Sequence, residues 1–383
     1  MSAAKPSLEL LRSLTDEHVL RTLMRHRRAT RAEIAAHTDL SKPTVSDAVH
    51  RLTETGILAA TGERTTGRGR SGSYYTLEGA GGRALLAAVR PDGVAAEAVN
   101  AFGEITGSTH VELGRTAGRE SAARALAEAA HTLRGGTDAF KAAVVSAADP
   151  VDRESGRLVH LPDQPFLVGD LDPVAALGPC VSGPVLVDND VNWAARAERD
   201  TGCAVGIDDF VYVHLGEGLG AAVVSDGEVR RGGSGLGGEI AHLITAGPDG
   251  RAMPFTEVFA VLGLRRPGST AIDVGRLRAA LARDGAAERR TRSAVEHAVS
   301  GVLAAAIAFT DPRLVVVGGP WGADPAMVSA LAAAVAQDPR TVPVAAAEVP
   351  EPELAGARTR AVEELRRTVI AAAAGTASRP SGA

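Results

Sequence analysis

The chain has 383 residues, which is longer than one hydrophobic core usually supports, so we expect two or three domains. Its composition, 45% hydrophobic and 23% charged, excludes a disordered chain, and its 43 glycines and 3% aromatic residues indicate tight turns around an Ala/Val/Leu core. Residues 1–70 carry 12 Lys and Arg against 8 Asp and Glu, so the net charge of -5 leaves about -9 on the rest. A basic head on an acidic body favours nucleic-acid binding by the head, although a chance surplus of exposed arginines would give the same balance.

The cysteines and the N-terminus indicate the compartment. Cys180 and Cys203 are too few for a disulfide framework and lack the spacing of a metal site, so we expect two reduced, buried thiols. The stretch MSAAKPSLELLRSL lacks the apolar core of a secretory signal, and no run approaches the roughly 18 apolar residues that a membrane span needs. We therefore expect a cytoplasmic protein.

The first predicted helix begins at Thr15 or Asp16, which are N-cap candidates, and ends near Arg28. A second, short helix follows, because Thr30 and Glu33 fit a capping box. Residues 37–40, HTDL, read as a turn. Ser41 can then cap a third helix, in which Pro43 occupies a position whose N–H would have no partner in any case.

The third helix has two distinct faces. Its buried stripe is Val45, Ala48, Val49 and Leu52. Hydrogen-bonding residues occupy the other face, as in a recognition helix that enters a DNA major groove: Lys42, Thr44, Ser46, Asp47, His50 and Arg51. An ordinary amphipathic helical hairpin would show the same stripe, but it would not need two capped short helices followed by a wing.

Residues 57–77 are typical of such a wing, with two short β runs, 57–61 and 73–77, joined by a Gly/Thr/Arg loop. Arg64, Arg68 and Arg70 lie in this loop, where they can contact phosphates or enter a minor groove. A plain basic loop is the alternative. We predict a winged helix-turn-helix domain over residues 1–80, of a size that usually binds DNA as a dimer.

From residue 83 to about 375 the sequence alternates short β runs with Ala-rich helices, which is typical of an α/β domain. Asp226 and Gly227 are a strong signal for a hairpin turn. Residues 376–383 are expected to be a disordered tail.

The winged head, VDNDVNWAA (187–195), LGEGLGAAVVSDGEVRRGGSGLGGEIAHL (215–243) and RLVVVGGPWG (313–322) together resemble the ROK family of bacterial repressors, open reading frames and sugar kinases. The resemblance covers nearly the whole chain. It implies an α/β actin-like, ribonuclease H-like body of two lobes with a sugar bound between them, joined in the repressor branch to a winged helix-turn-helix.

The same resemblance implies the ligand-binding residues. Asn189 would hydrogen-bond a sugar hydroxyl, and Asp190 stands where the kinases keep the general base that deprotonates the attacking hydroxyl. Glu239 and His242, from GGEIAH, would reach neighbouring hydroxyls, and Glu257 would add a further carboxylate. Taken alone, Asp190 could be only an N-cap, and Glu239 with His242 only a surface pair.

The departures from the family bear on catalysis. The kinases begin the body with an Asp-x-Gly-Gly-Thr phosphate turn, whereas this chain has AVRPDGV from Ala88 to Val94, with Pro91 unable to donate an N–H. Glu217 replaces a small hydroxyl residue in the second phosphate turn, and it would repel a phosphate unless a cation intervenes. Phosphoryl transfer depends on positioning and charge stabilisation, so we predict no kinase activity.

Family members usually complete a zinc site with one His and three Cys. The loop after His242 reads LITAGPDGRAMPFTE and holds no Cys, so we predict no metal and no cofactor. Without a zinc ion to hold it, the loop that carries Glu257 is expected to be less rigid than in the family.

These observations predict a transcription regulator, acting as a repressor, whose degenerate kinase body senses a sugar or sugar derivative. Its partners would be double-stranded operator DNA and a second copy of itself, as a homodimer or a dimer of dimers that uses helices such as residues 294–310. One rival is an active ATP-dependent sugar kinase with a DNA-binding head. A second rival is a regulator whose DNA binding responds to a protein partner and not to a sugar.

Arg70→Ala should weaken DNA binding and reduce the slope of log affinity against log salt concentration by about 1, because one phosphate contact is lost. Gel shifts at several salt concentrations measure this slope. An unchanged slope would exclude Arg70 from the phosphate contacts.

Overall fold

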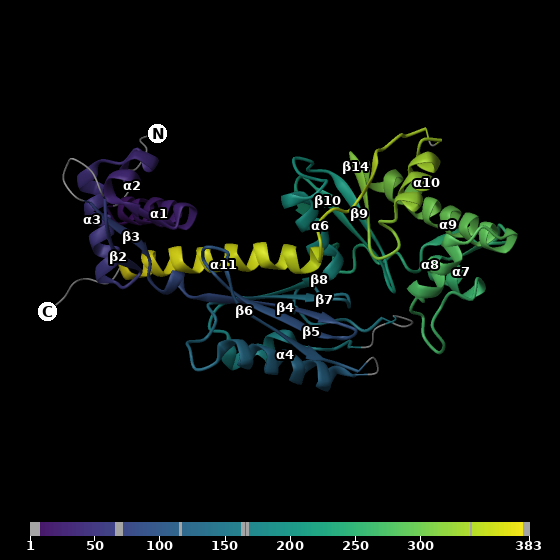
Figure 1. Ribbon diagram of the computed structural model, residues 1–383, viewed down its shortest axis with the longest axis horizontal. Coiled ribbons are helices and arrows are strands. Elements are labelled where there is room, and N and C mark those ends of the chain that lie inside the picture. The colour runs from purple at the N-terminus through teal and green to yellow at the C-terminus, as the bar shows by residue number, and fades with distance from the viewer. Residues whose placement is uncertain are drawn as a thin grey trace.

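The computed structural model describes residues 8–65, 72–114, 117–161, 165, 168–337 and 339–377. They form a small helical head, a two-lobed body, and a long C-terminal helix that runs from the junction of the lobes to the head (Figure 1).

The head contains three helices and a three-stranded sheet. Its elements are α1 (Leu8–His26), β1 (Arg28–Thr30), α2 (Arg31–Thr38), α3 (Lys42–Glu54), β2 (Leu58–Arg64) and β3 (Ser73–Leu77). The strand β3 lies between β1 and β2, and all pairs are antiparallel. The winged helix-turn-helix is therefore confirmed. The strand β1 was not predicted, because three residues are too few to show a periodic pattern.

The predicted caps of the two short helices are also confirmed. Thr30 and Glu33 form the reciprocal capping box at the start of α2. The hydroxyl of Ser41 accepts a 3.3 Å hydrogen bond from the backbone N–H of Thr44, and Pro43 lies in the first turn of α3. The predicted stripe of α3 is buried: Val45, Ala48, Val49 and Leu52.

The predicted start of the first helix is wrong. The helix α1 begins at Leu8, and within it the Thr15 hydroxyl donates to the Leu11 carbonyl instead of capping. Asp16 points into the head, where its carboxylate lies 2.6 Å from the guanidinium of Arg51. Burial raises the pKa of Asp16 in spite of this arginine. Asp16 therefore joins α1 to α3, a long-range role that a local cap signal does not reveal.

The first lobe has a five-stranded sheet in the order β6-β5-β4-β7-β8. Its elements are β4 (Arg83–Arg90), β5 (Gly93–Asn100), β6 (Ile105–Glu112), α4 (Arg119–Arg134), β7 (Ala142–Ala147), α5 (Pro173–Leu177) and β8 (Val185–Asn189), with short 3-10 turns at Glu78–Gly81 and Gly178–Cys180. The helix α4 covers one face of the sheet, and the C-terminal helix covers the other (Figure 1). Successive residues of β4 face opposite sides of the sheet, and both sides are covered, so residues 84–89 between its two terminal arginines are all apolar and buried.

The second lobe has the strand order β11-β10-β9-β14-β15. Its elements are α6 (Asp190–Thr201), β9 (Phe210–Leu215), β10 (Leu219–Ser225), β11 (Glu228–Val229), β12 (Ile244–Ala246), β13 (Ala252–Pro254), α7 (Phe255–Val261), α8 (Val274–Ala282), α9 (Ala286–Thr310), β14 (Leu314–Gly318), α10 (Pro325–Val335) and β15 (Val344–Ala346). In each lobe three antiparallel strands are followed by two parallel ones, so the two lobes share one topology.

Several smaller predictions can be assessed here. Asp226 and Gly227 form the predicted β10–β11 hairpin turn, both with positive φ. Cys180 is buried, but Cys203 is only half-buried, and both thiols are free. By length and composition alone, α9 could cross a membrane, contrary to our expectation of no such run. In the fold it is a packing helix, whose residues Val295, Val302 and Leu303 enter the core of the second lobe.

The helix α11 (Pro352–Ala377) connects the parts of the molecule. Its 26 residues span about 39 Å at 1.5 Å per residue. It packs on α6, β4 and β7 near its start and on α1 of the head further along. Residues of the head, of α11 and of the first sheet share one hydrophobic cluster. The head is therefore packed against the body and not joined to it by a flexible linker alone. Of the predicted tail, residues 376 and 377 belong to α11, and 378–383 lie outside the described residues.

The Asp16–Arg51 pair provides a test of the head. Arg51→Met should lower the free energy of unfolding by about 2 kcal/mol, because it leaves a buried carboxylate alone; this loss is below that of a fully buried pair, since Arg51 is partly exposed. Thermal unfolding measures the loss. The double variant Asp16→Asn/Arg51→Met should recover part of it, and a double variant no more stable than Arg51→Met would contradict this role.

Candidate functional sites

The exposed face of α3 is the candidate DNA-reading surface. Lys42, Asp47 and His50 are exposed, and Thr44 and Ser46 are half-buried. His50 lies 3.2 Å from Glu54 one turn further on. Arg51 departs from the predicted outward set, because its ion pair with Asp16 turns it toward α1. The proposed reading face is therefore Lys42, Thr44, Ser46, Asp47 and His50, with Arg51 in a structural role.

In the wing, Arg64 is exposed at the end of β2, whereas Arg68 and Arg70 lie outside the described residues. Two further arginines flank the wing and were missed in the sequence. Arg28 lies 5.1 Å from the ring centre of Tyr74, and Arg31 lies 5.0 Å from that of Tyr75. The unpredicted strand β1 pairs with β3 and contains Arg28, and Arg31 follows it as the first residue of α2.

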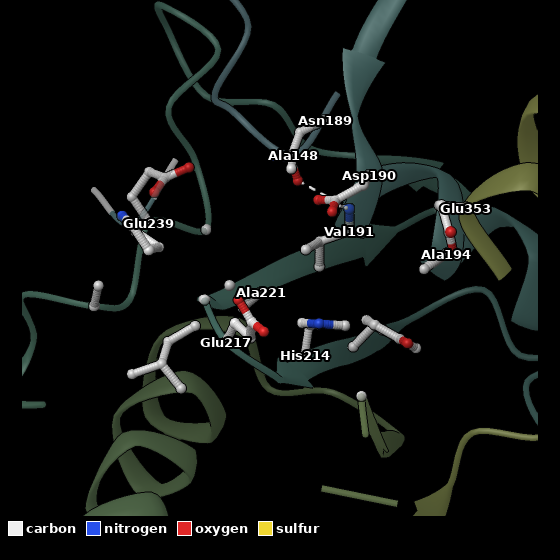
Figure 2. Close-up of a pocket in the computed structure, with 18 of the residues that line it drawn as sticks. Ala148, Asn189, Asp190, Val191, Ala194, His214, Glu217, Ala221, Glu239 and Glu353 are labelled. Atoms are coloured by element: carbon white, nitrogen blue, oxygen red, sulfur yellow. Dashed lines mark hydrogen bonds between the residues drawn. The ribbon is translucent and has the colours of Figure 1, made fainter. Parts of the chain in front are cut away.

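The second site is a cavity of about 580 Å³ between the lobes. It is lined by the ends of β4 and β8, the first turns of α6 and α11, and the β9–β10 turn. Figure 2 shows Asn189 and Asp190 on one side of it, with His214, Glu217 and Glu239 around the same space. Its volume is in the range of small-molecule sites.

Asn189 and Asp190 mark the point where β8 becomes α6. The Asn189 side chain, not that of Asp190, caps the helix, accepting a 2.9 Å bond from the Val191 N–H. The Asn189 amide also donates to the carbonyls of Ala147 and Asp149, at 3.4 and 3.3 Å. Asp190 begins the helix, accepts from the Val191 N–H at 2.7 Å and lines the cavity.

Two buried carboxyls, Asp190 in the cavity lining and Asp149 behind it, have strongly raised pKa values. Burial, with the charges of Glu353, Glu239 and Asp149, raises the pKa of Asp190 to about 7. Burial and the charge of Glu239 also raise the pKa of Asp149 to about 7. Each carboxyl therefore carries its proton about half of the time at neutral pH. Glu353, which lines the cavity, and Asp149, which lies behind the lining beside Ala148, were not predicted from the sequence. Asp149 comes two residues after the buried strand β7, which is a usable signal, whereas Glu353 is distant in sequence.

The GGEIAH segment reaches the cavity through a glycine-dependent turn. Gly238 has a φ of +100°, and a Cβ there would lie 1.9 Å from the carbonyl oxygen of Ala221. This approach places Glu239 and His242 in the cavity lining. Glu257 does not line the cavity; its carboxylate lies 3.1 Å from Arg265, and its neighbour Thr256 faces the cavity instead. The predicted ligand role of Glu257 is therefore not supported by its position.

The loop between His242 and α7 is held without zinc ligands. Its ends pair as the β12–β13 hairpin, and the buried Thr245 hydroxyl donates to the Ala298 carbonyl on α9 at 2.7 Å. Within the described ranges of the chain, no group of three or more His, Cys, Asp or Glu residues is placed to hold a metal ion.

At the position of the kinase phosphate turn, Arg90 and Pro91 line the cavity. The Arg90 guanidinium contacts Glu353 and lies 3.1 Å from Glu351, so it joins β4 to the start of α11. In the second turn, Glu217 lies 2.6 Å from Arg266. This cation reduces the repulsion of phosphate that Glu217 alone would cause, so the case against nucleotide binding rests more on Arg90 and Pro91.

Asp149→Asn should stabilise the protein at neutral pH. In the unfolded chain the carboxyl ionises near 3.8, but in the fold it keeps its proton to about pH 7, so stability falls as pH rises between these values. The variant should gain on the order of 2 kcal/mol at pH 8 and much less at pH 4.5. Urea unfolding at the two pH values measures the gain, and a gain that does not grow with pH would contradict the buried-acid assignment.

Comparison with known families identifies both parts of the chain. Residues 92–257 match the ROK family, and residues 15–69 match the MarR family. The xylose repressor of Caldicellulosiruptor bescii is 23% identical over 241 residues, which cover 61% of this chain and 59% of the repressor. Over the first curated relatives, this chain spans between 21% and 59% of their lengths.

Two solved structures share the fold. A ROK family transcriptional regulator, a homologue of the E. coli MLC protein, has a TM-score of 0.66 at 16% identity, over 95% of this chain and 99% of that one. A ROK family glucokinase from Streptomyces griseus, in complex with glucose and AMPPNP, has a TM-score of 0.56 at 23% identity, over 74% of this chain and all of that one. The body thus has the actin-like ROK fold, and relatives include both repressors and kinases. The chain combines an N-terminal MarR-type winged-helix domain with a ROK-family domain.

Proposed function

We propose that the protein is a sequence-specific transcription regulator, acting as a repressor in the cytoplasm, whose kinase-like body binds a sugar or sugar derivative and thereby changes DNA binding. Support comes from the fused winged head and ROK body, and from repressors among the relatives.

One observation carries the proposal. The cavity keeps Asn189, Asp190, Glu239 and His242, which suit a polyol, while Arg90 stands in the former phosphate turn and is bound to the acidic start of α11. A backbone cradle for a triphosphate needs unobstructed N–H groups, and the turn here contains Pro91.

The helix α11 offers a route from the cavity to the head. Burial, and after it the charge of Glu353 at the start of α11, raises the pKa of Asp190, and α11 also packs on α1 of the head. A ligand that alters the Asp190 and Glu353 surroundings acts on this helix, and it shifts the heads by its differential affinity for their two arrangements. A hundredfold change in DNA affinity needs a coupling of about 2.7 kcal/mol.

We further propose that two copies associate to present two heads to operator half-sites, as a homodimer or a dimer of dimers. The helix α9 supports this, because Phe309 near its C-terminal end is 90% exposed beside small apolar residues.

An active sugar kinase is the second candidate, and Asp190 favours it. A carboxyl with a pKa of about 7 suits a general base near neutral pH. A coupled ATP assay with hexoses and N-acetylhexosamines tests this candidate. Turnover above about 1 per second that disappears in Asp190→Asn would establish a kinase and overturn the proposal.

The regulator is tested by selecting an operator from random DNA and measuring gel shifts across a sugar panel. One sugar should change the operator affinity, and Glu239→Ala should remove this response while DNA binding stays intact. Glu257→Ala is the matched control, because Glu257 lies outside the cavity lining and should keep the response. Loss of DNA binding in Glu239→Ala would make Glu239 structural, and no response to any sugar would favour a protein partner as the signal.

A further inference from the structure

We infer that the cavity between the lobes takes a neutral disaccharide, and that His214 is a specificity residue for the second sugar unit. The inference rests on the proposed function, because it names the chemical class of the ligand that the regulator senses. The first unit would occupy the end of the cavity that is lined by Asn189, Glu239 and His242.

The cavity is larger than one sugar ring requires. Its volume of about 580 Å³ holds roughly 20 water molecules at about 30 Å³ each, whereas a hexose has only about 12 non-hydrogen atoms with which to displace them. Figure 2 shows Glu239 and Glu353 at opposite sides of this space, with Asp190 and His214 between them. A single sugar at the Glu239 end therefore leaves the Glu353 end unfilled.

His214 projects into this second half because of the strands around it. It lies on β9, and its register partners on the two neighbouring strands are Gly220 of β10 and Gly318 of β14. Neither partner has a side chain that could cover the imidazole. A Cβ at Gly216 would lie 2.5 Å from the imidazole Nε2, so the turn after β9 also leaves this ring its space. The His214 side chain is half-buried and lines the cavity.

The imidazole of His214 makes no hydrogen bond to any residue within the described ranges of the chain. Burial lowers its pKa, although the charge of Glu353 acts in the opposite direction. The ring is therefore mainly neutral at pH 7, with one nitrogen as a donor and the other as an acceptor. Both nitrogens can pair with hydroxyl groups of a ligand.

The charged groups around His214 suit hydroxyls better than a phosphate. Arg90 is the one arginine among the described residues that line the cavity, and its guanidinium is held by Glu351 and Glu353. The carboxyls of Asp190 and Glu353 accept hydrogen bonds, which the hydroxyls of a sugar donate. A phosphate would be repelled by these carboxyls, and the nearest arginine is already engaged.

The remaining wall of this half leaves room for a ring. Its small apolar residues are Ala194 on α6, Pro320 after β14 and Pro352 at the start of α11. The Pro320 ring also lies beside Gly216, since a Cβ there would be 3.3 Å from its Cδ. Such residues can pack against the C–H faces of a pyranose, while a few polar groups, His214 among them, fix its orientation.

Calorimetric titration of the full chain at pH 7 tests the inference. For the gluco, manno and galacto configurations, the free hexose, its methyl glycoside, its α-1,4 and β-1,4 disaccharides, its p-nitrophenyl glycoside and its 6-phosphate are compared. In the configuration that binds, one disaccharide should bind at least about tenfold more tightly than the hexose and the methyl glycoside, because its second unit adds several hydrogen bonds.

Variants assign this preference to His214. His214→Phe keeps a ring of similar size but removes both nitrogens, so it should reduce the preference to about threefold or less. Its affinity for the hexose should stay unchanged, which also shows that the cavity is folded. His214→Gln retains a donor and an acceptor and should keep part of the preference. His131→Phe, the same change at an exposed position of α4, should keep all of it.

The outcomes separate the two levels of the argument. A hexose or a 6-phosphate that binds as tightly as every disaccharide would overturn the disaccharide inference and leave the sugar-sensing proposal standing. An equally tight p-nitrophenyl glycoside would replace the second sugar unit by an apolar group, which also contradicts the inference. A preference that survives His214→Phe, or a loss of hexose binding in this variant, would overturn the assignment to His214. Absence of binding by every sugar would overturn both levels.

Discussion

The contact between Arg90 and the acidic start of α11 is the constraint on which the arrangement of the molecule depends. Arg90 closes the strand β4 at the cavity, and Glu351 and Glu353 tie it to a 26-residue helix that also packs on the head. Arg90 and Glu353 are half-buried, so their contact is stronger than an exposed pair would be, whereas Glu351 is exposed. The same Glu353 acts on Asp190, which couples the electrostatics of the cavity to the helix that supports the head.

Under the proposed function, this contact would also account for a kinase-like body that recognises a ligand without transferring a phosphoryl group. A kinase turn must leave backbone N–H groups open to phosphate, whereas here an arginine is already engaged and a proline has no N–H to give. Polyol recognition, as proposed, would need only carboxylates and amides in fixed positions, and the β8–α6 junction and the Gly238 turn hold such groups in place. A carboxyl in the cavity lining with a pKa near 7, beside a second buried one, is typical of a functional site, because the fold would be more stable without such groups.

Features that depend on a few neighbouring residues, such as helix caps and a hairpin turn, could be predicted from the sequence. The capping box at Thr30, the Ser41 cap and the Asp226–Gly227 turn depend on a few adjacent residues, and each is found as predicted. Residues paired across long separations were not predictable in this way. Asp16 reads as a cap but contacts Arg51, 35 residues away, and Glu353 reaches a cavity whose other residues precede it by 130 positions or more in most cases.

The most direct test of the account is calorimetric titration of the protein with Mg·AMPPNP, alone and with a bound sugar. The account predicts sugar binding without saturable nucleotide binding up to about 1 mM, because the phosphate turn is closed by Arg90 and Pro91. Micromolar binding of the nucleotide, with its terminal phosphate directed at Asp190 in a crystal structure, would contradict it.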